Sequence, residues 1–150
     1  MPNELSHKLL VRPSSSSGRI STAASTSADF LVDGKSLLGI LVREHGGHGD
    51  FMGVFVKGFR EAQAGVARQL RLQAPPSSDS GRVLLYICPE CGDIGCGAYS
   101  AKVGRDQGTY SWSDFAYENG YEDSRPLERV GPFAFEANQY EAAIASASAL

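Results

Sequence analysis

Apolar residues recur at helical spacing in three stretches of the chain: residues 35–45, about 60–72, and from about 136 onward. The residues that share a face in these stretches are Leu37, Leu38, Leu41 and Val42; Phe59, Ala62, Val66 and Leu70; and Ala137, Tyr140, Ile144 and Ala147. The Gly46-Gly47 pair marks the end of the first stretch, because glycine is favoured just past a helix end. The pattern therefore predicts three amphipathic helices.

Runs of β-branched, aliphatic and aromatic residues bounded by turn residues predict strands in the rest of the chain. These runs are residues 30–32, 51–56, 82–87, 98–103 and 109–117. Asp33-Gly34 and residues 104–108 supply turns, and residues 75–81 form a predicted loop. We therefore predict an α+β fold, with a small, mostly antiparallel sheet and two or three helices packed on it.

Residues 1–28 are rich in Ser, Thr and Ala, and almost no large apolar residue follows Val11. Such a stretch buries too little apolar surface to offset the entropy lost on ordering. We therefore expect a disordered N-terminal tail over residues 1–28 and a single α+β domain over residues 29–150. A transit peptide is a less favoured interpretation of the same Ser-rich, acid-poor stretch.

The length of 150 residues is typical of one globular domain. No run approaches the roughly 18 consecutive apolar residues that a membrane span needs. The N-terminus also lacks the apolar segment of a secretory signal. These features predict a soluble cytoplasmic protein that does not associate with membranes.

The net charge of −3 is unevenly distributed. Residues 1–81 carry nine Lys and Arg against seven Asp and Glu, whereas residues 82–150 carry five against ten. Nucleic-acid binding needs clustered cations, so the acidic second half argues against it. The same acidity suits a basic protein partner, although acidic surfaces also serve solubility alone.

The most distinctive segment is Cys88-Pro-Glu-Cys91-Gly-Asp-Ile-Gly-Cys96-Gly. Two thiolates separated by two residues can bind one Zn²⁺, but a full zinc ribbon has a second such pair, which this chain lacks. The missing ligands would come from elsewhere in the chain. The candidate zinc ligands are Cys88, Cys91, Cys96, His45 and His48, with Asp93 a weaker one.

Two other interpretations of the cysteines stay open. Reduced thiols can simply pack in a tight connection between two strands, and we rank this interpretation first and zinc second. A thiol oxidoreductase ranks third, because a reactive thiolate needs a nearby cation or helix N-terminus and the neighbours here are Glu90 and Asp93.

Residues 112–123 interleave aromatic and acidic side chains. Aromatic residues provide affinity at protein interfaces, and acidic residues select a basic partner. An ordinary strand with Trp112 facing inward is an equally good interpretation. The candidate partner-binding residues are Asp114, Phe115, Tyr117, Glu118, Tyr121, Glu122 and Asp123.

The stretch from Val83 to about Ala145 resembles a family of short, uncharacterised bacterial proteins, some of which are loosely labelled oxidoreductases. The matching features are Leu84-Leu-Tyr-Ile-Cys88, Cys91-Gly92, Gly95-Cys96, Trp112-Ser113, Phe115, Gly131-Pro-Phe133-Ala-Phe135 and Tyr140. Gly97 stands where many of these relatives have Trp. The resemblance implies a single bacterial domain and brings no established activity.

No nucleophile elbow, zinc-protease motif or dinucleotide-binding glycine pattern is present, so the sequence favours a non-enzymatic protein. We expect a cytosolic protein-binding domain, for example an immunity-type protein that neutralises a basic toxin. The alternatives are a small structural zinc protein and a thiol oxidoreductase. The expected cofactor is therefore none or zinc.

Overall fold

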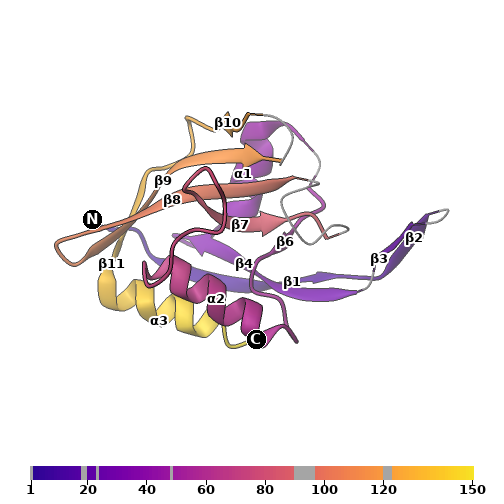
Figure 1. Cartoon of the computed structure of the whole chain (residues 1–150), viewed down its shortest axis with the longest axis horizontal. Helices are drawn as coiled ribbons and strands as arrows, with labels where there is room; N and C mark the ends of the chain where they lie inside the picture. Colours follow the sequence, from indigo (N-terminus) through magenta and orange to yellow (C-terminus); the bar gives the residue numbers. More distant parts are fainter. Residues whose placement is uncertain (1, 18–19, 23, 48, 90–96, 120–122) are drawn as a thin grey trace.

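The computed structural model describes residues 2–17, 20–22, 24–47, 49–89, 97–119 and 123–150. In this part of the chain, three helices pack with antiparallel sheets, which confirms the predicted α+β class (Figure 1). None of the helices described is long and apolar enough to cross a membrane.

The larger sheet is antiparallel throughout. Its strands, in spatial order, are β10 (Arg125–Pro126), β9 (Thr109–Glu118), β8 (Ala98–Asp106), β7 (Val83–Ile87) and β6 (Met52–Gly53), with β11 (Phe133–Glu136) also pairing with β9. β8 and β9 form the predicted hairpin, which turns at Gln107-Gly108. The strand predicted over residues 51–56 is shorter than expected, because only Met52–Gly53 pairs with β7.

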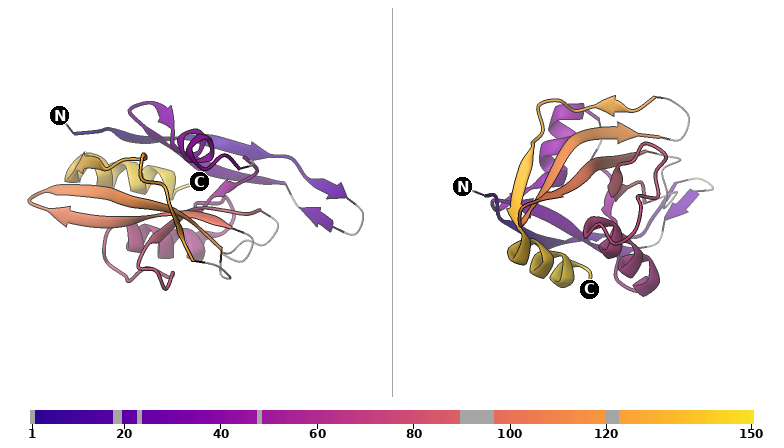
Figure 2. Two further views of the ribbon diagram at one scale, coloured as in Figure 1. Left: turned by 90° about the horizontal axis from the view of Figure 1, so that it is seen from above. Right: turned by 60° about the vertical axis from the view of Figure 1, so that its left-hand side comes forward.

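A second sheet has the order β1 (Leu5–Arg12), β4 (Ser25–Val32) and β5 (Lys35–Ser36). Between β1 and β4, the short strands β2 (Ser15–Ser17) and β3 (Ile20–Thr22) pair with each other. Single bridges link the two sheets at both sides, from Ser27 to Val56 and from Asn3 to Phe135. The strands therefore form a nearly closed ring around a shared core (Figure 2).

The N-terminal segment differs from the disordered tail that the sequence predicted over residues 1–28. All of Leu5–Arg12 pairs in register with Ser25–Val32, and Leu5 and Ala28 are buried. The folded part of the chain therefore begins well before residue 29. The composition of an isolated segment is a poor guide here, because strand stability depends on cross-strand pairing and burial against the rest of the fold.

The helices begin and end close to their predicted limits. α1 (Leu37–His45) packs on β4, α3 (Ala137–Ala147) packs on β1 and β11, and α2 (Arg60–Leu70) lies against α3 and β7. The Ser36 hydroxyl caps α1 by accepting from the Gly39 N–H, and Gly46 ends it with a left-handed φ of 79°. In Figure 1, α2 and α3 lie on one side of the strands and α1 on the other.

Trp112 is completely buried at the centre of the core. Its ring makes edge contacts with Phe30 and Phe135, at centroid distances of 5.2 and 5.3 Å. The indole N–H donates to the Tyr140 hydroxyl at 2.9 Å, and that hydroxyl donates to the Leu70 carbonyl at 2.7 Å. One hydroxyl therefore joins β9, α3 and the end of α2.

A second buried polar cluster fixes the start of α1. The Asp29 carboxylate accepts from the Tyr86 and Ser36 hydroxyls, both at 2.6 Å. The Tyr86 hydroxyl in turn accepts from the Phe30 N–H at 3.0 Å. Burial, together with the neighbouring Asp29 carboxylate, raises the pKa of Tyr86 well above its usual value, so its hydroxyl stays protonated and can donate.

Candidate functional site

The cysteine segment connects β7 to β8, as the sequence predicted. Cys88 is buried, and its N–H donates to the Gly97 carbonyl at 3.2 Å, which closes the base of the loop. Cys91, Asp93, Cys96 and also His48 lie outside the described residues. A buried thiol is poorly placed to attack a substrate, so the position of Cys88 does not favour redox chemistry at this residue.

His45 lies close to the base of this loop. Its ring stacks on Tyr117, with centroids 4.2 Å apart, and its Nδ1 lies 3.1 Å from the Tyr99 hydroxyl. The Tyr117 ring also lies against Gly97, so close that any side chain at position 97 would collide with the ring. Burial raises the pKa of Tyr99 to about 12, which keeps this hydroxyl protonated. The fold therefore brings His45 to the same region as the ends of the cysteine loop.

Among the residues that the structure describes, no three His, Cys, Asp or Glu side chains are arranged to hold a metal ion. Three of the five predicted zinc ligands, Cys91, Cys96 and His48, lie outside the described residues. The zinc site therefore stays a prediction.

The acidic and aromatic residues of positions 112–123 do not form the continuous surface that the sequence suggested. Phe115 and Glu118 are buried and Tyr117 is half-buried against His45. Of the candidate residues that the structure describes, Asp114 and Asp123 alone are exposed. Tyr121 and Glu122 lie outside the described residues. Phe115 and Glu118 are therefore unable to contact a partner in this conformation.

A β-bulge in β9 explains why these residues do not alternate between the core and the surface as predicted. Ser113 pairs with Lys102 and Ala116 pairs with Ser100, so Asp114 and Phe115 together oppose a single residue of β8. Asp114 occupies the left-handed region, with a φ of 51°. Strict alternation places Trp112 and Phe115 on opposite faces of the strand, whereas the extra residue turns both into the core.

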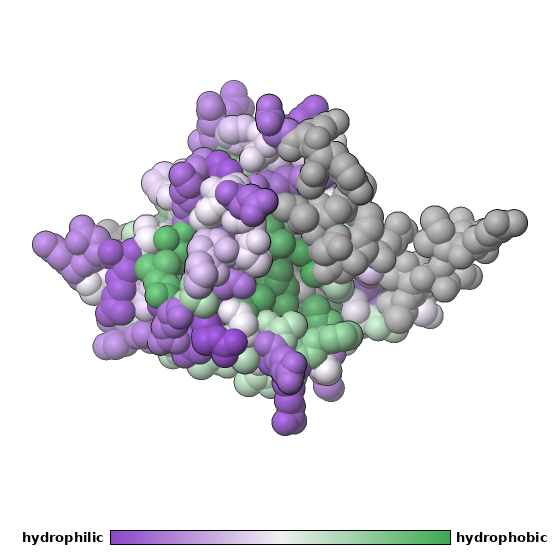
Figure 3. All heavy atoms as spheres, viewed as in Figure 1, coloured by the Kyte–Doolittle hydropathy of each residue, from purple (hydrophilic) through white to green (hydrophobic). Residues whose placement is uncertain are grey.

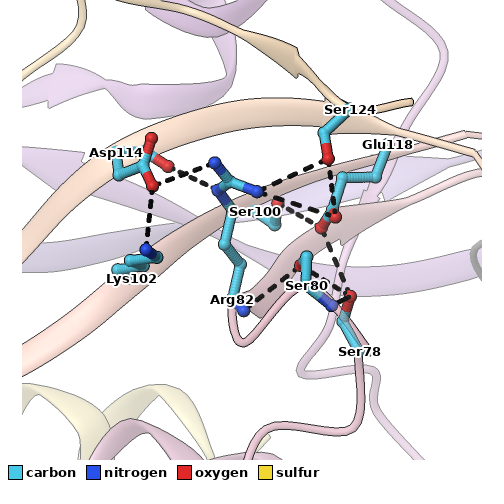
Figure 4. A network of polar contacts seen from close by, with 8 residues as sticks. All are labelled: Ser78, Ser80, Arg82, Ser100, Lys102, Asp114, Glu118 and Ser124. Carbon is cyan, nitrogen blue, oxygen red and sulfur yellow. Dashed lines mark hydrogen bonds and ion pairs between the residues drawn. The ribbon is translucent and has the colours of Figure 1, made fainter.

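Asp114 and Glu118 of this segment are paired within the molecule (Figure 4). Arg82 donates to the Asp114 carboxylate at 2.9 Å and to its backbone carbonyl at 2.8 Å, and the Lys102 ammonium lies 3.4 Å from the same carboxylate. Hydrogen bonding to Arg82 is the main cause of a lowered Asp114 pKa. Buried Glu118 accepts from Ser100 at 2.6 Å and lies 4.0 Å from Arg82. This network fastens the 75–82 loop to the sheet.

The exposed apolar surface lies elsewhere, at the end of β1. Val11 is 69% exposed, Phe59 63% and Leu9 56%. Val11 and Phe59 also line a hollow of about 310 Å³ together with Val56 and Lys57. Figure 3 shows hydrophobic residues at the surface beside the start of α2. Sequence reasoning missed this surface because it assigned β1 to a disordered tail.

The outer edge of β1 also leaves backbone groups unpaired. The Leu5 N–H and carbonyl both bond to the Gln139 side chain rather than to β4. By the alternation of an antiparallel pair, the corresponding groups of His7, Leu9 and Val11 point outward along the same edge. Within the described part of the chain, these groups have no hydrogen-bond partner. Such an edge is a template for another strand.

No protein-family model, no curated protein and no solved structure matches the chain.

Proposed function

We propose that this chain is a protein-binding domain that takes up an extended segment of its partner along the outer edge of β1. The observation that carries the proposal is the coincidence of unpaired backbone groups at His7, Leu9 and Val11 with exposed apolar side chains at the same place. Strand addition of this kind combines main-chain hydrogen bonds for affinity with side-chain contacts for specificity.

The apolar side chains supply the driving force. Burying a Leu, Val or Phe side chain that was exposed contributes about 1.5–3 kcal/mol each. Leu9 and Val11 lie on the same face of β1, and Phe59 lines the hollow next to Val11. A partner strand that pairs with β1 would bury all three.

Charge complementarity indicates the chemistry of the partner segment. Lys8 and Lys57 are exposed and form no ion pair among the described residues, whereas Arg12 is already paired with Asp50 at 2.7 Å. A segment with alternating apolar residues and flanking acids fits this edge. An immunity-type role remains compatible with it, but a basic toxin segment does not suit these lysines.

A displayed library of random peptides, selected on the folded protein, tests the proposal. We expect enriched peptides with alternating apolar positions and acidic flanks. Leu9→Pro should abolish their binding, because it removes an outward N–H without breaking the ladder to β4. Val11→Asp should also abolish binding, whereas Leu72→Ser, which changes an apolar residue that is 46% exposed at the far end of α2, should have no effect. Peptides that bind all three folded variants equally would contradict the proposal.

A structural zinc site is the second candidate function. The observation that favours it is the position of His45, whose ring stacks on the Tyr117 ring. The Tyr117 ring in turn lies against Gly97, the residue that follows Cys96. Metal analysis of the purified protein should then give near-stoichiometric zinc, which is lost in Cys88→Ser and in His45→Gln but kept in His7→Gln. Purified protein that holds no zinc after growth in zinc-containing medium would eliminate this candidate.

A further inference from the structure

A pocket of about 380 Å³ lies between α2 and the residues that follow α3, apart from the β1 edge and the cysteine loop. It is lined by Arg60, Gln63, Ala64, Ala67, Arg68, Arg71, Ser148, Ala149 and Leu150. The α2 residues in this set recur every three or four positions, so they share one face of the helix. The two alanines leave room on that face, and the longer side chains form the walls.

The side chains that line the pocket carry an excess of positive charge. None of its three arginines takes part in an ion pair among the described residues, and no Asp or Glu side chain belongs to the described lining. The Arg71 Nε donates to the Ala67 carbonyl at 3.3 Å, which holds that guanidinium along the helix. The Tyr140 hydroxyl fixes the end of α2 through the Leu70 carbonyl. The C-terminal end of α2 favours cations, which accounts for Arg68 and Arg71 but not for Arg60 at the start of the helix.

Gln63 provides an independent observation. Its side chain lines the pocket, only 2% of the residue is exposed, and its amide nitrogen has no hydrogen-bond partner. Buried polar groups are almost always paired, and leaving one unpaired costs about 1–3 kcal/mol. A small rotation of the Gln63 side chain toward the pocket would let an acceptor oxygen bound there satisfy this amide.

We propose that this pocket binds a small ligand through an oxyanion group, with the Arg68 and Arg71 guanidinium groups as charge partners and the Gln63 amide as an additional donor. Planar guanidinium groups match phosphate and carboxylate oxygens in charge and geometry. The volume is that of a small-molecule site. This site lies beyond the docking surface proposed above and does not depend on it.

Titration with inorganic phosphate, followed by calorimetry and by amide NMR shifts, tests the proposal on the full chain. We expect saturable binding, with shifts concentrated on α2 and on the Gln63 side-chain NH₂. Arg68→Gln and Arg71→Gln should each weaken binding about tenfold or more. Arg43→Gln, which removes an exposed arginine at the end of α1, should leave binding unchanged. Parallel titrations with acetate distinguish a carboxylate from a phosphate as the preferred oxyanion.

Gln63→Met separates binding from stability. Methionine has a similar shape and no unpaired donor, so this variant should be at least as stable as the parent without ligand and should bind phosphate more weakly. Binding that is not saturable, or that persists unchanged in Arg68→Gln/Arg71→Gln, would overturn the proposal. So would equal affinity in folded Gln63→Met and the parent.

Discussion

Replacing Tyr140 by Phe removes one hydroxyl and leaves the shape of the side chain almost unchanged. The hydroxyl accepts from the Trp112 N–H at 2.9 Å and donates to the Leu70 carbonyl at 2.7 Å, and Tyr140 and Trp112 are both fully buried. In Tyr140→Phe, the Trp112 N–H and the Leu70 carbonyl each lose this partner in an interior that offers no water in exchange.

The cost follows from these two bonds. A typical intramolecular hydrogen bond contributes about 0.5–1.5 kcal/mol, and a buried group left unpaired costs about 1–3 kcal/mol. We therefore expect Tyr140→Phe to lower the free energy of unfolding by about 2–3 kcal/mol. For a chain of this length, that corresponds to a fall in Tm of roughly 5–10 °C.

Urea unfolding measured by tryptophan fluorescence is a direct assay, because Trp112 is the only tryptophan in the chain. Tyr110→Phe is a matched control: the Tyr110 ring stacks on Tyr140 at 4.2 Å, but its hydroxyl bonds are longer, at 3.2 and 3.3 Å to the partly exposed Arg105 and Glu141. We expect the control to lose about 1 kcal/mol or less. Equal losses in both variants, or a loss below about 0.5 kcal/mol in Tyr140→Phe, would refute the reasoning.

Two further changes test the packing and the electrostatics. Gly53→Ala should lower the free energy of unfolding, measured in urea, by more than about 3 kcal/mol, because the new methyl group would overlap the Ala28 backbone carbonyl. Gly65→Ala is the control: the nearest side chain to its new methyl group is Arg68, at 4.0 Å, so this variant should be neutral or stabilising. The pKa of Asp114 is lowered mainly by its hydrogen bond from Arg82, so its ionised form stabilises the fold above the usual value of 3.8 and this contribution fades as the pH falls below it. Arg82→Gln should flatten that acid dependence in urea melts from pH 5 downward, and an unchanged pH profile would contradict the assignment.

The helices and the β8–β9 hairpin could be predicted because local pattern and tertiary environment agree. Tyr140 and Ile144 share the predicted face of α3 and are buried, and Gly46 ends α1 where the sequence predicted, in a left-handed conformation. Periodicity succeeds in α3 because one side of that helix faces the core. In α2 the limits are right but the predicted face is wrong, because Phe59 and Ala62 are exposed whereas Gln63 and Ala67 are buried with Leu70.

The errors arise where the decisive partner is distant in sequence. β1 was missed because its stability comes from pairing with Ser25–Val32 and from the bonds of Leu5 to Gln139, neither of which leaves a local pattern. The bulge at Asp114 was missed because one extra residue reverses the alternation on which the inward and outward assignments of residues 112–123 were based. The arginine face of α2 did leave a signal in its spacing, but spacing alone does not reveal that a pocket forms over it.

The uneven charge of the chain shows why net charge misleads about binding. The acidic second half suggested a basic partner, yet Asp114 is held by Arg82 and Lys102, and Glu118 is buried beside Ser100. A charge that is compensated inside the fold attracts a partner only weakly, because the field it projects is cancelled at short range. Among the described residues, the lysines beside β1 and the arginines of α2 form no ion pair and lie next to apolar or hollow surface. Both proposed sites therefore call for acidic ligands, although the protein itself is acidic.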